Sequence, residues 1–254
     1  MGMKDDLKAG KSLVGTMVAI VDNPDIAKIL RVSGFDFIII DNEHGYMDYQ
    51  SAAGIIGMAR AMDYPALVRI PEAGREVILK YAEMGASGFL LPNCETAGQA
   101  RALVEYSKYA PLGNRGVALL RAHANYEKQA SAVEYMAKAN AQGVLMCQIE
   151  SPIGVGNIDA ILDVEGIDAA FIGPNDLSQS YGLMGQFSHP TVVGAIDAVI
   201  ASARRRGKFS GIHFTGAPEM LQPWIAKGMT LNLWSNDITL MMTKAAEGLK
   251  TLRG

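Results

Sequence analysis

The chain has 254 residues and a formal net charge of −3, from 23 Lys and Arg residues against 26 Asp and Glu residues. This near balance argues against a protein that binds nucleic acid through a basic surface. Apolar residues make up 49% of the chain and charged residues 19%, which is typical of a packed globular protein and excludes global disorder.

Nothing in the sequence points to secretion or to a membrane. Cys94 and Cys147 are too few for a disulfide scaffold, and both lie in apolar stretches, which suits a reducing compartment. Residues 1–11 carry charges and lack the apolar segment of a signal peptide. Apolar runs such as 35–40 fall far short of the roughly 20 residues that span a bilayer. We therefore expect a soluble cytoplasmic protein.

Short apolar runs recur along the chain and alternate with longer helical patterns. The runs are rich in Val, Ile, Leu and Phe without polar alternation, which is typical of strands buried on both faces. The predicted strands are Leu13–Ile20, Asp36–Asp41, Ala66–Ile70, Gly88–Leu91, Val144–Glu150, Ala169–Gly173, Phe209–Phe214 and Met229–Trp234.

Helical periodicity fills the segments between these runs. Prolines at 24, 190 and 218 mark the first turns of three of the helices. The predicted helices are Pro24–Ser33, Tyr49–Ala61, Glu76–Met84, Thr96–Ser107, Tyr126–Ala141, Ala160–Val164, Pro190–Arg206, Pro218–Ala226 and Ile238–Leu252.

Eight strands, each mostly followed by a helix, predict an α/β protein with a parallel (β/α)8 (TIM) barrel as a single domain over residues 1–254. A doubly wound open sheet is the alternative, but no Gly-x-Gly-x-x-Gly turn follows the first strand to support a dinucleotide-binding version. The longest irregular stretch, 111–126, has the length of a functional or mobile loop.

Polar residues cluster where four of the predicted strands end. They are Asp-Asn-Glu-His-Gly at 41–45, Arg-Ile-Pro at 69–71, Gln-Ile-Glu-Ser at 148–151 and Gly-Pro-Asn-Asp-Leu-Ser at 173–178. Barrel enzymes carry their active sites at the carboxyl ends of the strands. The sequence therefore predicts an active site built from these four segments.

Glu150 and Asp176 are one carboxylate each on neighbouring strand ends. Two carboxylates, waters and a chelating substrate suit Mg²⁺ or Mn²⁺, and the lack of Cys and His ligands here argues against structural zinc. The alternative is that Glu150 forms a salt bridge and Asp176 caps the next helix. Their joint position at adjacent strand ends favours the metal site.

His44 and Arg69 are the candidate catalytic side chains. A histidine titrates near neutrality and suits a general base, although a lone loop histidine is as often a simple hydrogen-bonding group. Arg69 could pair with Asp41 or Glu43, or could stabilise the oxygen of an enolate through its fixed donors.

Substrate contacts are expected from the segment after strand six. The backbone N–H groups of Asn175 and Asp176 could seat a carboxylate, since Pro174 has none to offer. Further candidates for substrate binding are Asp41, Gln148, Gly173 and His213, the last of which also suits a simple hydrogen bond at a strand end.

In this order, the four segments resemble those of the metal-dependent class II pyruvate aldolases of the HpcH/HpaI type. That family includes 4-hydroxy-2-oxoheptane-1,7-dioate aldolase and 2-dehydro-3-deoxyglucarate aldolase. The resemblance extends from Leu13 to the last helix. It implies a barrel of the phosphoenolpyruvate/pyruvate superfamily and a hexamer in which the C-terminal helix, about 238–252, swaps between subunits.

The resemblance also assigns roles. It implies that Glu150 and Asp176 bind Mg²⁺ or Mn²⁺, with Co²⁺ as a further candidate. It makes His44 the base, places Arg69 on the keto or enolate oxygen, and places the pyruvate carboxylate at the backbone of residues 175 and 176.

Two positions depart from the family pattern. Glu83 stands where well-studied members carry an Asp that partners the catalytic base. The longer side chain keeps the charge but shifts the carboxylate. His213 stands where relatives often carry an apolar residue beside the pyruvate methyl group, so it could narrow the pocket or touch the acceptor.

The function expected from the resemblance is reversible cleavage of 4-hydroxy-2-keto acids to pyruvate and an aldehyde, so the partners are small molecules. An alternative within enzymes is oxaloacetate decarboxylation or another carbon–carbon lyase reaction through the pyruvate enolate. A catalytically silent oligomeric binding protein is a third alternative, against which the set of His44, Arg69, Glu150 and Asp176 speaks.

Overall fold

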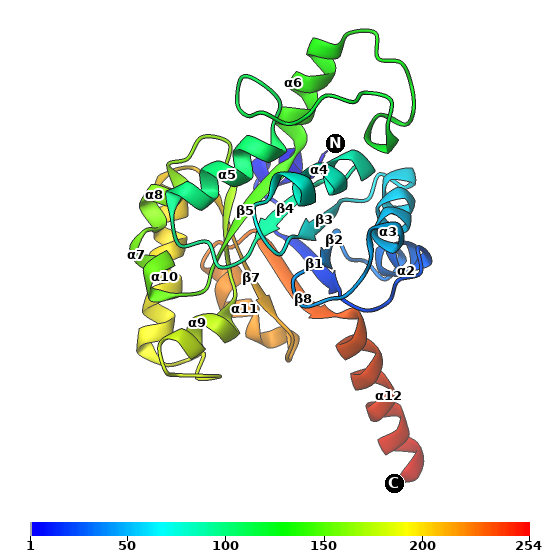
Figure 1. The fold of residues 1–254 in the computed structure, drawn as a ribbon. Coiled ribbons are helices and arrows are strands. Elements are labelled where there is room, and N and C mark those ends of the chain that lie inside the picture. Colours follow the sequence, from blue (N-terminus) through cyan, green and yellow to red (C-terminus); the bar gives the residue numbers. More distant parts are fainter. Residues whose placement is uncertain (1) are drawn as a thin grey trace.

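The computed structural model describes residues 2–254, in which eight parallel strands close into a barrel in sequence order (Figure 1). Each strand pairs with the next, and the last pairs with the first. The strands are β1 (Leu13–Val18), β2 (Phe37–Asp41), β3 (Ala66–Arg69), β4 (Gly88–Leu91), β5 (Val144–Ile149), β6 (Ala169–Ile172), β7 (Phe209–Phe214) and β8 (Leu231–Asn236). The predicted parallel barrel is confirmed.

Helix α1 precedes β1 and contributes Met3 and Leu7 to the cluster inside the barrel. The other helices follow strands, and most of them lie around the outside of the barrel (Figure 1). The α-helices are α1 (Met3–Lys8), α2 (Asp25–Val32), α3 (Tyr49–Ala61), α4 (Arg75–Met84), α5 (Ala97–Ser107), α6 (Ala132–Gln142), α7 (Pro152–Gly156), α8 (Ile158–Leu162), α9 (Pro174–Ser180), α10 (Pro190–Arg205), α11 (Gln222–Ala226) and α12 (Asp237–Arg253). Two short 3-10 helices are η1 (Ala122–Ala124) and η2 (Pro218–Met220). Helices α1, α7 and α9 were not predicted, because segments of five to seven residues span two turns or fewer and give only a weak periodic signal.

The pleat of the strands explains both the apolar runs and the site. In β2, Phe37 and Ile39 belong to the cluster inside the barrel, while Ile38 and Ile40 pack outward against the helices. Both faces are therefore apolar, and the strand reads as a continuous hydrophobic run. The same alternation directs the next inward position, Asp41, into the mouth of the barrel.

Other strands repeat this arrangement. Leu67, Met146 and Phe171 lie inside the barrel, and residues two positions further along, Arg69, Gln148 and Gly173, line the cavity at its mouth. A side chain at every second position faces the same side of a strand. The polar residues at the strand ends therefore converge for two reasons. The strands are parallel, and each of these residues lies two positions after a residue that faces the inside of the barrel.

The boundaries of α6 and β8 are among those that differ from the prediction. Helix α6 begins at Ala132, not at Tyr126, because Asn125 and Tyr126 have positive φ angles of 55° and 59° that no α-helix accommodates. Ser131 then caps the helix by accepting a hydrogen bond from the Glu134 N–H. Strand β8 extends two residues beyond the predicted Trp234, to Asn236.

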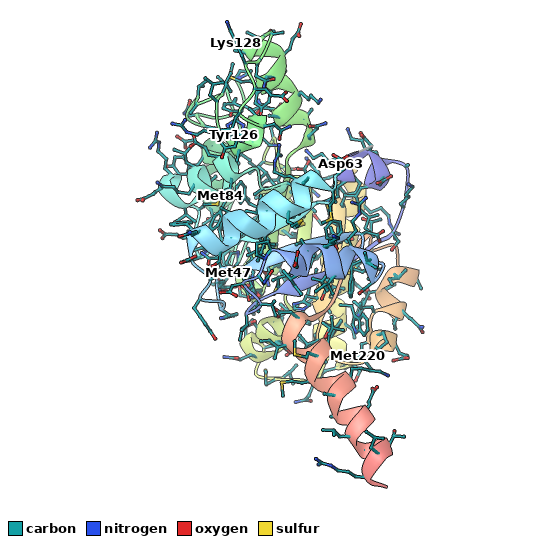
Figure 2. All side chains as sticks on the ribbon, turned by 90° about the vertical axis from the view of Figure 1, so that its right-hand side faces the viewer. Met47, Asp63, Met84, Tyr126, Lys128 and Met220 are labelled. Carbon is teal, nitrogen blue, oxygen red and sulfur yellow. The ribbon has the colours of Figure 1, made fainter. Side chains whose placement is uncertain are left out.

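Helix α12 projects from the carboxyl end of the barrel, whereas α6 and the loop before it project from the opposite end (Figure 1). Figure 2 shows the same two ends of the molecule, with Tyr126 and Lys128 far from α12. Of the α12 side chains only Asp237 is buried. No helix within residues 2–254 has the length and apolar character needed to cross a bilayer.

Asp237 ties the start of α12 to the loop after β1. Its carboxylate accepts hydrogen bonds from the backbone N–H groups of Ala19, Ile20 and Val21 at 3.2, 3.0 and 2.8 Å. Since Ala19 and Ile20 line the cavity at the barrel mouth, this buried carboxylate fixes one wall of that cavity.

Replacing Asp237 with Ala is expected to lower the free energy of unfolding by about 2–4 kcal/mol, because three N–H groups lose their acceptor. Asp197→Ala is the control. It removes only a partly exposed ion pair with Lys227, and such pairs contribute about 0–1 kcal/mol. Urea unfolding of both variants measures the difference. Equal losses would contradict the role of Asp237.

Candidate active site

A cavity of about 360 Å³ opens at the carboxyl ends of the strands. Eight of the predicted site residues line it: Asp41, His44, Arg69, Gln148, Gly173, Asn175, Asp176 and His213. A ninth, Glu150, is buried beside them and accepts a hydrogen bond from Gln148 Nε2 at 2.6 Å. The four polar segments of the sequence therefore meet in one place.

Among residues 2–254, Arg69 is the only arginine that lines this cavity, and two carboxylates hold it. Its Nε and Nη2 donate to the two oxygens of Asp41 at 2.9 and 2.7 Å, and Nη1 lies 2.9 Å from Glu43 Oε2. Burial alone would lower the pKa of Arg69, but the bonds to Asp41 and the charges of Asp41 and Glu43 raise it above its ordinary value. The group stays charged, with its plane fixed.

The sequence left two roles open for Arg69, an ion pair with Asp41 or Glu43 and the stabilisation of an enolate oxygen. The ion pair is present in the structure, and it involves both carboxylates. It leaves donors for a ligand, because a guanidinium has five N–H donors. Asp41 accepts two of them, Nη2 also lies 3.6 Å from Met17 Sδ, and the Glu43 contact is an ion pair without a hydrogen bond. Asp41 is 3% exposed, and it also accepts from the backbone N–H groups of Glu43 and His44 at 3.1 and 3.3 Å. Its carboxylate orients Arg69 and the loop.

Glu150 is the buried carboxylate of the site. Its Oε2 accepts from the backbone N–H of Asn93 at 2.9 Å, and its Oε1 accepts from Gln148. A Cβ at Gly173 would collide with Glu150 Oε1 and lie 2.8 Å from Gln148 Nε2. Only glycine therefore permits the approach of β6 to this side chain.

The charges of two carboxylates, Asp176 and Glu43, and the opposite charge of Arg69 act on Glu150. Burial, opposed by the Asn93 N–H bond and assisted by the charges of Asp176 and Glu43, raises the pKa of Glu150 to about 7. Burial also raises the pKa of Glu43, and Asp176 contributes to that shift. A site that collects carboxylates at this energetic cost suits a bound cation.

The donor set also fits a divalent metal. Within residues 2–254 no three His, Cys, Asp or Glu side chains converge as a metal-binding group. The two ligands predicted from the sequence, Glu150 and Asp176, would offer only carboxylate oxygens, which suit a hard cation that keeps coordination positions for water and substrate. The buried Gln148 Oε1 has no hydrogen-bond partner among the described residues and adds a free acceptor nearby.

His44 lies at the rim of the cavity, with its side chain 70% exposed. The nearest carboxylate oxygen to its Nε2 is that of Glu43, at 4.0 Å. The loop that carries it is tightly packed, because a Cβ at Gly45 would collide with the Asp41 carbonyl and lie 2.8 Å from that of Ala19. The imidazole can therefore reach a ligand in the cavity from a fixed backbone.

Glu83 does not meet His44 within one chain. It lies in the last turn of α4, which runs back toward the start of β4, so it belongs to the opposite end of the barrel. Its charge acts on Tyr109 and Arg115. The pairing expected from sequence is not formed in the monomer, because a helix of this fold ends at the amino ends of the strands.

Three further groups shape the site and were not among the predicted residues. Glu43 was noted only as a partner for Arg69, the contribution of Asn93 is a backbone N–H, and Asp237 acts on residues more than 200 positions away. Neither of the last two contacts leaves a pattern in the local sequence. Of the three groups, only Glu43 could have been identified from the sequence, because it belongs to the Asp-Asn-Glu-His-Gly segment.

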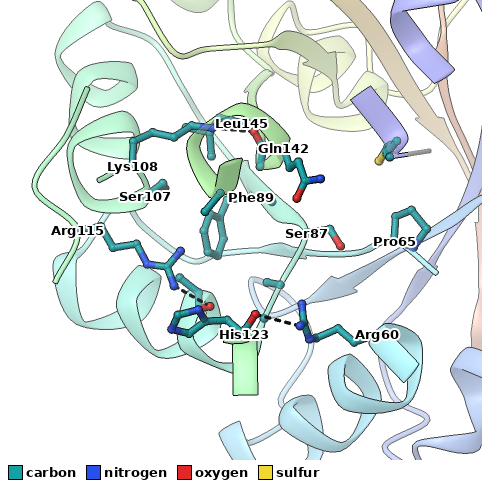
Figure 3. Close-up of a pocket in the computed structure, with 18 of the residues that line it drawn as sticks. Arg60, Pro65, Ser87, Phe89, Ser107, Lys108, Arg115, His123, Gln142 and Leu145 are labelled. Carbon is teal, nitrogen blue, oxygen red and sulfur yellow. Dashed lines mark hydrogen bonds between the residues drawn. The ribbon is translucent and has the colours of Figure 1, made fainter. Parts of the chain in front are cut away.

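A larger cavity of about 560 Å³ lies at the amino ends of the strands (Figure 3). Its cationic side chains hold the surrounding backbone. Lys108 Nζ donates to the Asn140 and Gly143 carbonyls at 2.7 Å, Arg60 donates to that of His123 at 3.0 Å, and Arg115 to that of Ala82 at 3.0 Å. These contacts give the cationic side chains of the larger cavity a structural role, because they fix α6 and the preceding loop. The candidate active site is therefore the smaller cavity, which the predicted site residues line.

Comparison with known proteins gives consistent matches. Residues 17–243 match the family described as HpcH/HpaI aldolase/citrate lyase. The chain is 34% identical to the hydroxypyruvate/pyruvate aldolase of Roseobacter denitrificans, over 94% of this chain and 92% of that protein. It is 37% identical to the 4-hydroxy-2-oxovalerate aldolase of Novosphingobium aromaticivorans, over 98% and 94%.

A solved structure agrees with these relatives. The HpcH/HpaI aldolase from Desulfitobacterium hafniense DCB-2 has a TM-score of 0.95 and 35% identity to this chain. The match covers 100% of this chain and 97% of the other.

The pKa of Glu150 gives a pH-dependent prediction for the metal-free protein. Folding raises the pKa of the Glu150 carboxyl group from its ordinary 4.5 to about 7. Below pH 4.5 the group is protonated in both the folded and the unfolded state, so it does not lower the free energy of unfolding. Above pH 7 it is charged in both states, and it lowers the free energy of unfolding by its full amount. Glu150→Gln is therefore expected to raise the free energy of unfolding by about 1–3 kcal/mol near pH 8 and by less near pH 5. Thermal unfolding in EDTA tests this, and a variant destabilised at both pH values would contradict it.

Proposed function

Because the chain belongs to the HpcH/HpaI aldolase/citrate lyase family, we propose that it cleaves 4-hydroxy-2-keto acids to pyruvate and an aldehyde and catalyses the reverse addition. As a member of that family it is a carbon–carbon lyase. The observation that carries the proposal is the arrangement at the barrel mouth, where a fixed guanidinium lies near the buried carboxylate of Glu150 and the exposed carboxylate of Asp176 lines the same cavity.

Glu150 and Asp176 would hold the divalent cation, for which Mg²⁺ and Mn²⁺ are the candidates and Co²⁺ a further one. Their oxygen ligands and mutual repulsion support this assignment. The cation supplies Lewis-acid polarisation of the 2-keto carbonyl when bound.

The protein groups bind the keto acid at its other atoms. The backbone N–H groups of Asn175 and Asp176 lie in the first turn of α9, where no carbonyl within the helix accepts from them, and they are free for the substrate carboxylate. Arg69 donates to the oxygen on C2 as negative charge develops there. Asp41 and Glu43 keep the guanidinium in place, so it does not have to reorient during the reaction.

His44 acts on the proton of the 4-hydroxyl. In cleavage its imidazole accepts that proton, the C3–C4 bond breaks, and the bonding pair passes to the pyruvate enolate while the aldehyde leaves. The enolate then takes up a proton at C3 to give pyruvate. The exposure of His44 at the rim supports this role, since the aldehyde end of the substrate must lie toward solvent.

The assembly is proposed to be a homo-oligomer, a hexamer, with α12 exchanged between subunits of a cytoplasmic enzyme. Helix α12 supports this, because its apolar residues Met241, Met242 and Leu252 are 64%, 66% and 84% exposed in the single chain. An amphipathic helix that projects from its own barrel is stabilised by packing on another surface.

We expect the protein to release pyruvate from 4-hydroxy-2-oxoheptanedioate or 2-dehydro-3-deoxyglucarate in the presence of Mg²⁺ or Mn²⁺. EDTA should stop this release, and restoring the metal should bring it back. Glu150→Ala and Asp176→Ala are expected to abolish turnover and keep the circular dichroism of the fold. Release that survives EDTA would overturn the metal assignment. Turnover of oxaloacetate alone would favour a decarboxylase.

His44→Ala is expected to lower kcat by about 10²–10⁴-fold, the usual loss on removing a general base. His189→Ala provides the control, since that imidazole caps α10 away from the cavity. Steady-state kinetics with the same substrate measures both variants. An unchanged rate in His44→Ala would remove it from the mechanism.

A further inference from the structure

The loop that joins β4 to α5 lies against the end of β5, where Glu150 stands. The backbone N–H of Asn93 donates to Glu150 Oε2 at 2.9 Å, and that of Cys94 donates to the Gln148 carbonyl at 3.0 Å. The Gln148 side chain in turn donates to Glu150 Oε1 at 2.6 Å. Two successive amides of the loop therefore fix both the strand end and its carboxylate.

Glu95, the next residue of the loop, adds a side-chain contact. Its carboxylate accepts a hydrogen bond from the hydroxyl of Ser151, the residue directly after Glu150. Its backbone carbonyl accepts from Asn157 Nδ2 at 2.8 Å. Glu95 and Ser151 are both partly buried, so water competes less for this bond to a charged acceptor. We refer to residues 93–95 as the β5 clamp.

Gln99, in the first turn of α5, holds the β5 clamp in place. Its Oε1 accepts from the Glu95 N–H at 2.9 Å, and its Nε2 donates to the Asn93 carbonyl at 3.2 Å. Asn93 has a positive φ of 47°, a conformation that asparagine adopts more readily than most residues. Both polar ends of the Gln99 side chain thus fix the turn whose N–H binds Glu150.

The contacts of the Glu150 carboxylate leave it one orientation toward a cation. Each carboxylate oxygen accepts through two lone pairs. Asn93 occupies one lone pair on Oε2, and Gln148 occupies one on Oε1. The second lone pair of each oxygen is not used by a hydrogen bond within residues 2–254, and its direction is set by the carboxylate plane that these two donors fix.

Resting on the function proposed above and its metal site, we propose that Glu95 is a positioning residue for the divalent cation. By binding the Ser151 hydroxyl it holds the end of β5 against the β5 clamp, so that the oxygens of Glu150 keep the direction in which they ligate. Glu95 itself contacts neither the cation nor the substrate. Hydrogen bonds that orient metal ligands in this way are worth about 10- to 100-fold in metal affinity.

The test measures the Kd of Mn²⁺ for the full chain without substrate, from the electron paramagnetic resonance signal of free Mn²⁺. Glu95→Ala is expected to raise this Kd by about tenfold, at the lower end of that range because Glu95 acts through Ser151. Glu95→Gln keeps an oxygen that accepts from the Ser151 hydroxyl. It is expected to stay within about threefold of the wild type, because the contact and not the charge positions Glu150.

Asp159→Ala is the matched control. Asp159 of α8 likewise accepts a hydrogen bond from a serine hydroxyl, that of Ser202 in α10, away from the residues that line the cavity. It is expected to leave the Kd of Mn²⁺ within about twofold of the wild type. Thermal unfolding in EDTA measures the stability of each variant, so a general loss of stability is separated from a loss of metal affinity.

Gln99→Ala is a second variant, which loosens the β5 clamp without removing a contact to β5. It is expected to raise the Kd of Mn²⁺ by about threefold, in the same direction as Glu95→Ala. A Kd that falls or stays constant in Gln99→Ala would contradict the path from α5 through Asn93 to Glu150.

A Kd that is unchanged in Glu95→Ala, or that rises equally in Glu95→Gln or in Asp159→Ala, would overturn the positioning role. A wild type that binds no Mn²⁺ would overturn this role together with the proposed function. Wild-type binding that weakens in Glu95→Ala, in a protein that releases no pyruvate, would support the positioning role and reject the proposed function.

Discussion

The charge balance at the barrel mouth is the constraint on which the rest of the site depends. Four carboxylates, those of Asp41, Glu43, Glu150 and Asp176, lie around the single guanidinium of Arg69. Asp41 and Glu43 neutralise Arg69 and fix it, which leaves Glu150 and Asp176 without an ion pair among the described residues. Water is largely excluded around Glu150, so the charge of this carboxylate is weakly screened and a bound cation has a strong effect on it.

The scaffold supports this charge cluster with groups that carry little chemistry of their own. Gly173 lets β6 approach Glu150, the Asn93 N–H orients the carboxylate, and Asp237 holds the loop after β1 through three backbone amides. The cavity is therefore preformed on strands and short loops. Preorganisation of this kind lets donors act on developing charge without first reorienting.

The strands were predicted to within two residues at each end because burial on both faces leaves a continuous apolar run, as in β2 and β4. The start of α6 was wrong because the positive φ angles of Asn125 and Tyr126 interrupt a segment whose composition still suits a helix. Glu83 illustrates a different limit. Its place in the sequence indicates α4, but which end of the barrel it occupies depends on the direction of the helix.

The sequence by itself determined the eight-stranded barrel and the residues that stand at its carboxyl ends, because hydrophobic periodicity and strand parity are local properties. Tertiary structure decided how those residues act on one another. Arg69 binds both Asp41 and Glu43, and His213 binds the carbonyl of Ser235 in β8. Such contacts join strands far apart in the chain, where direction and distance are fixed only when the barrel closes.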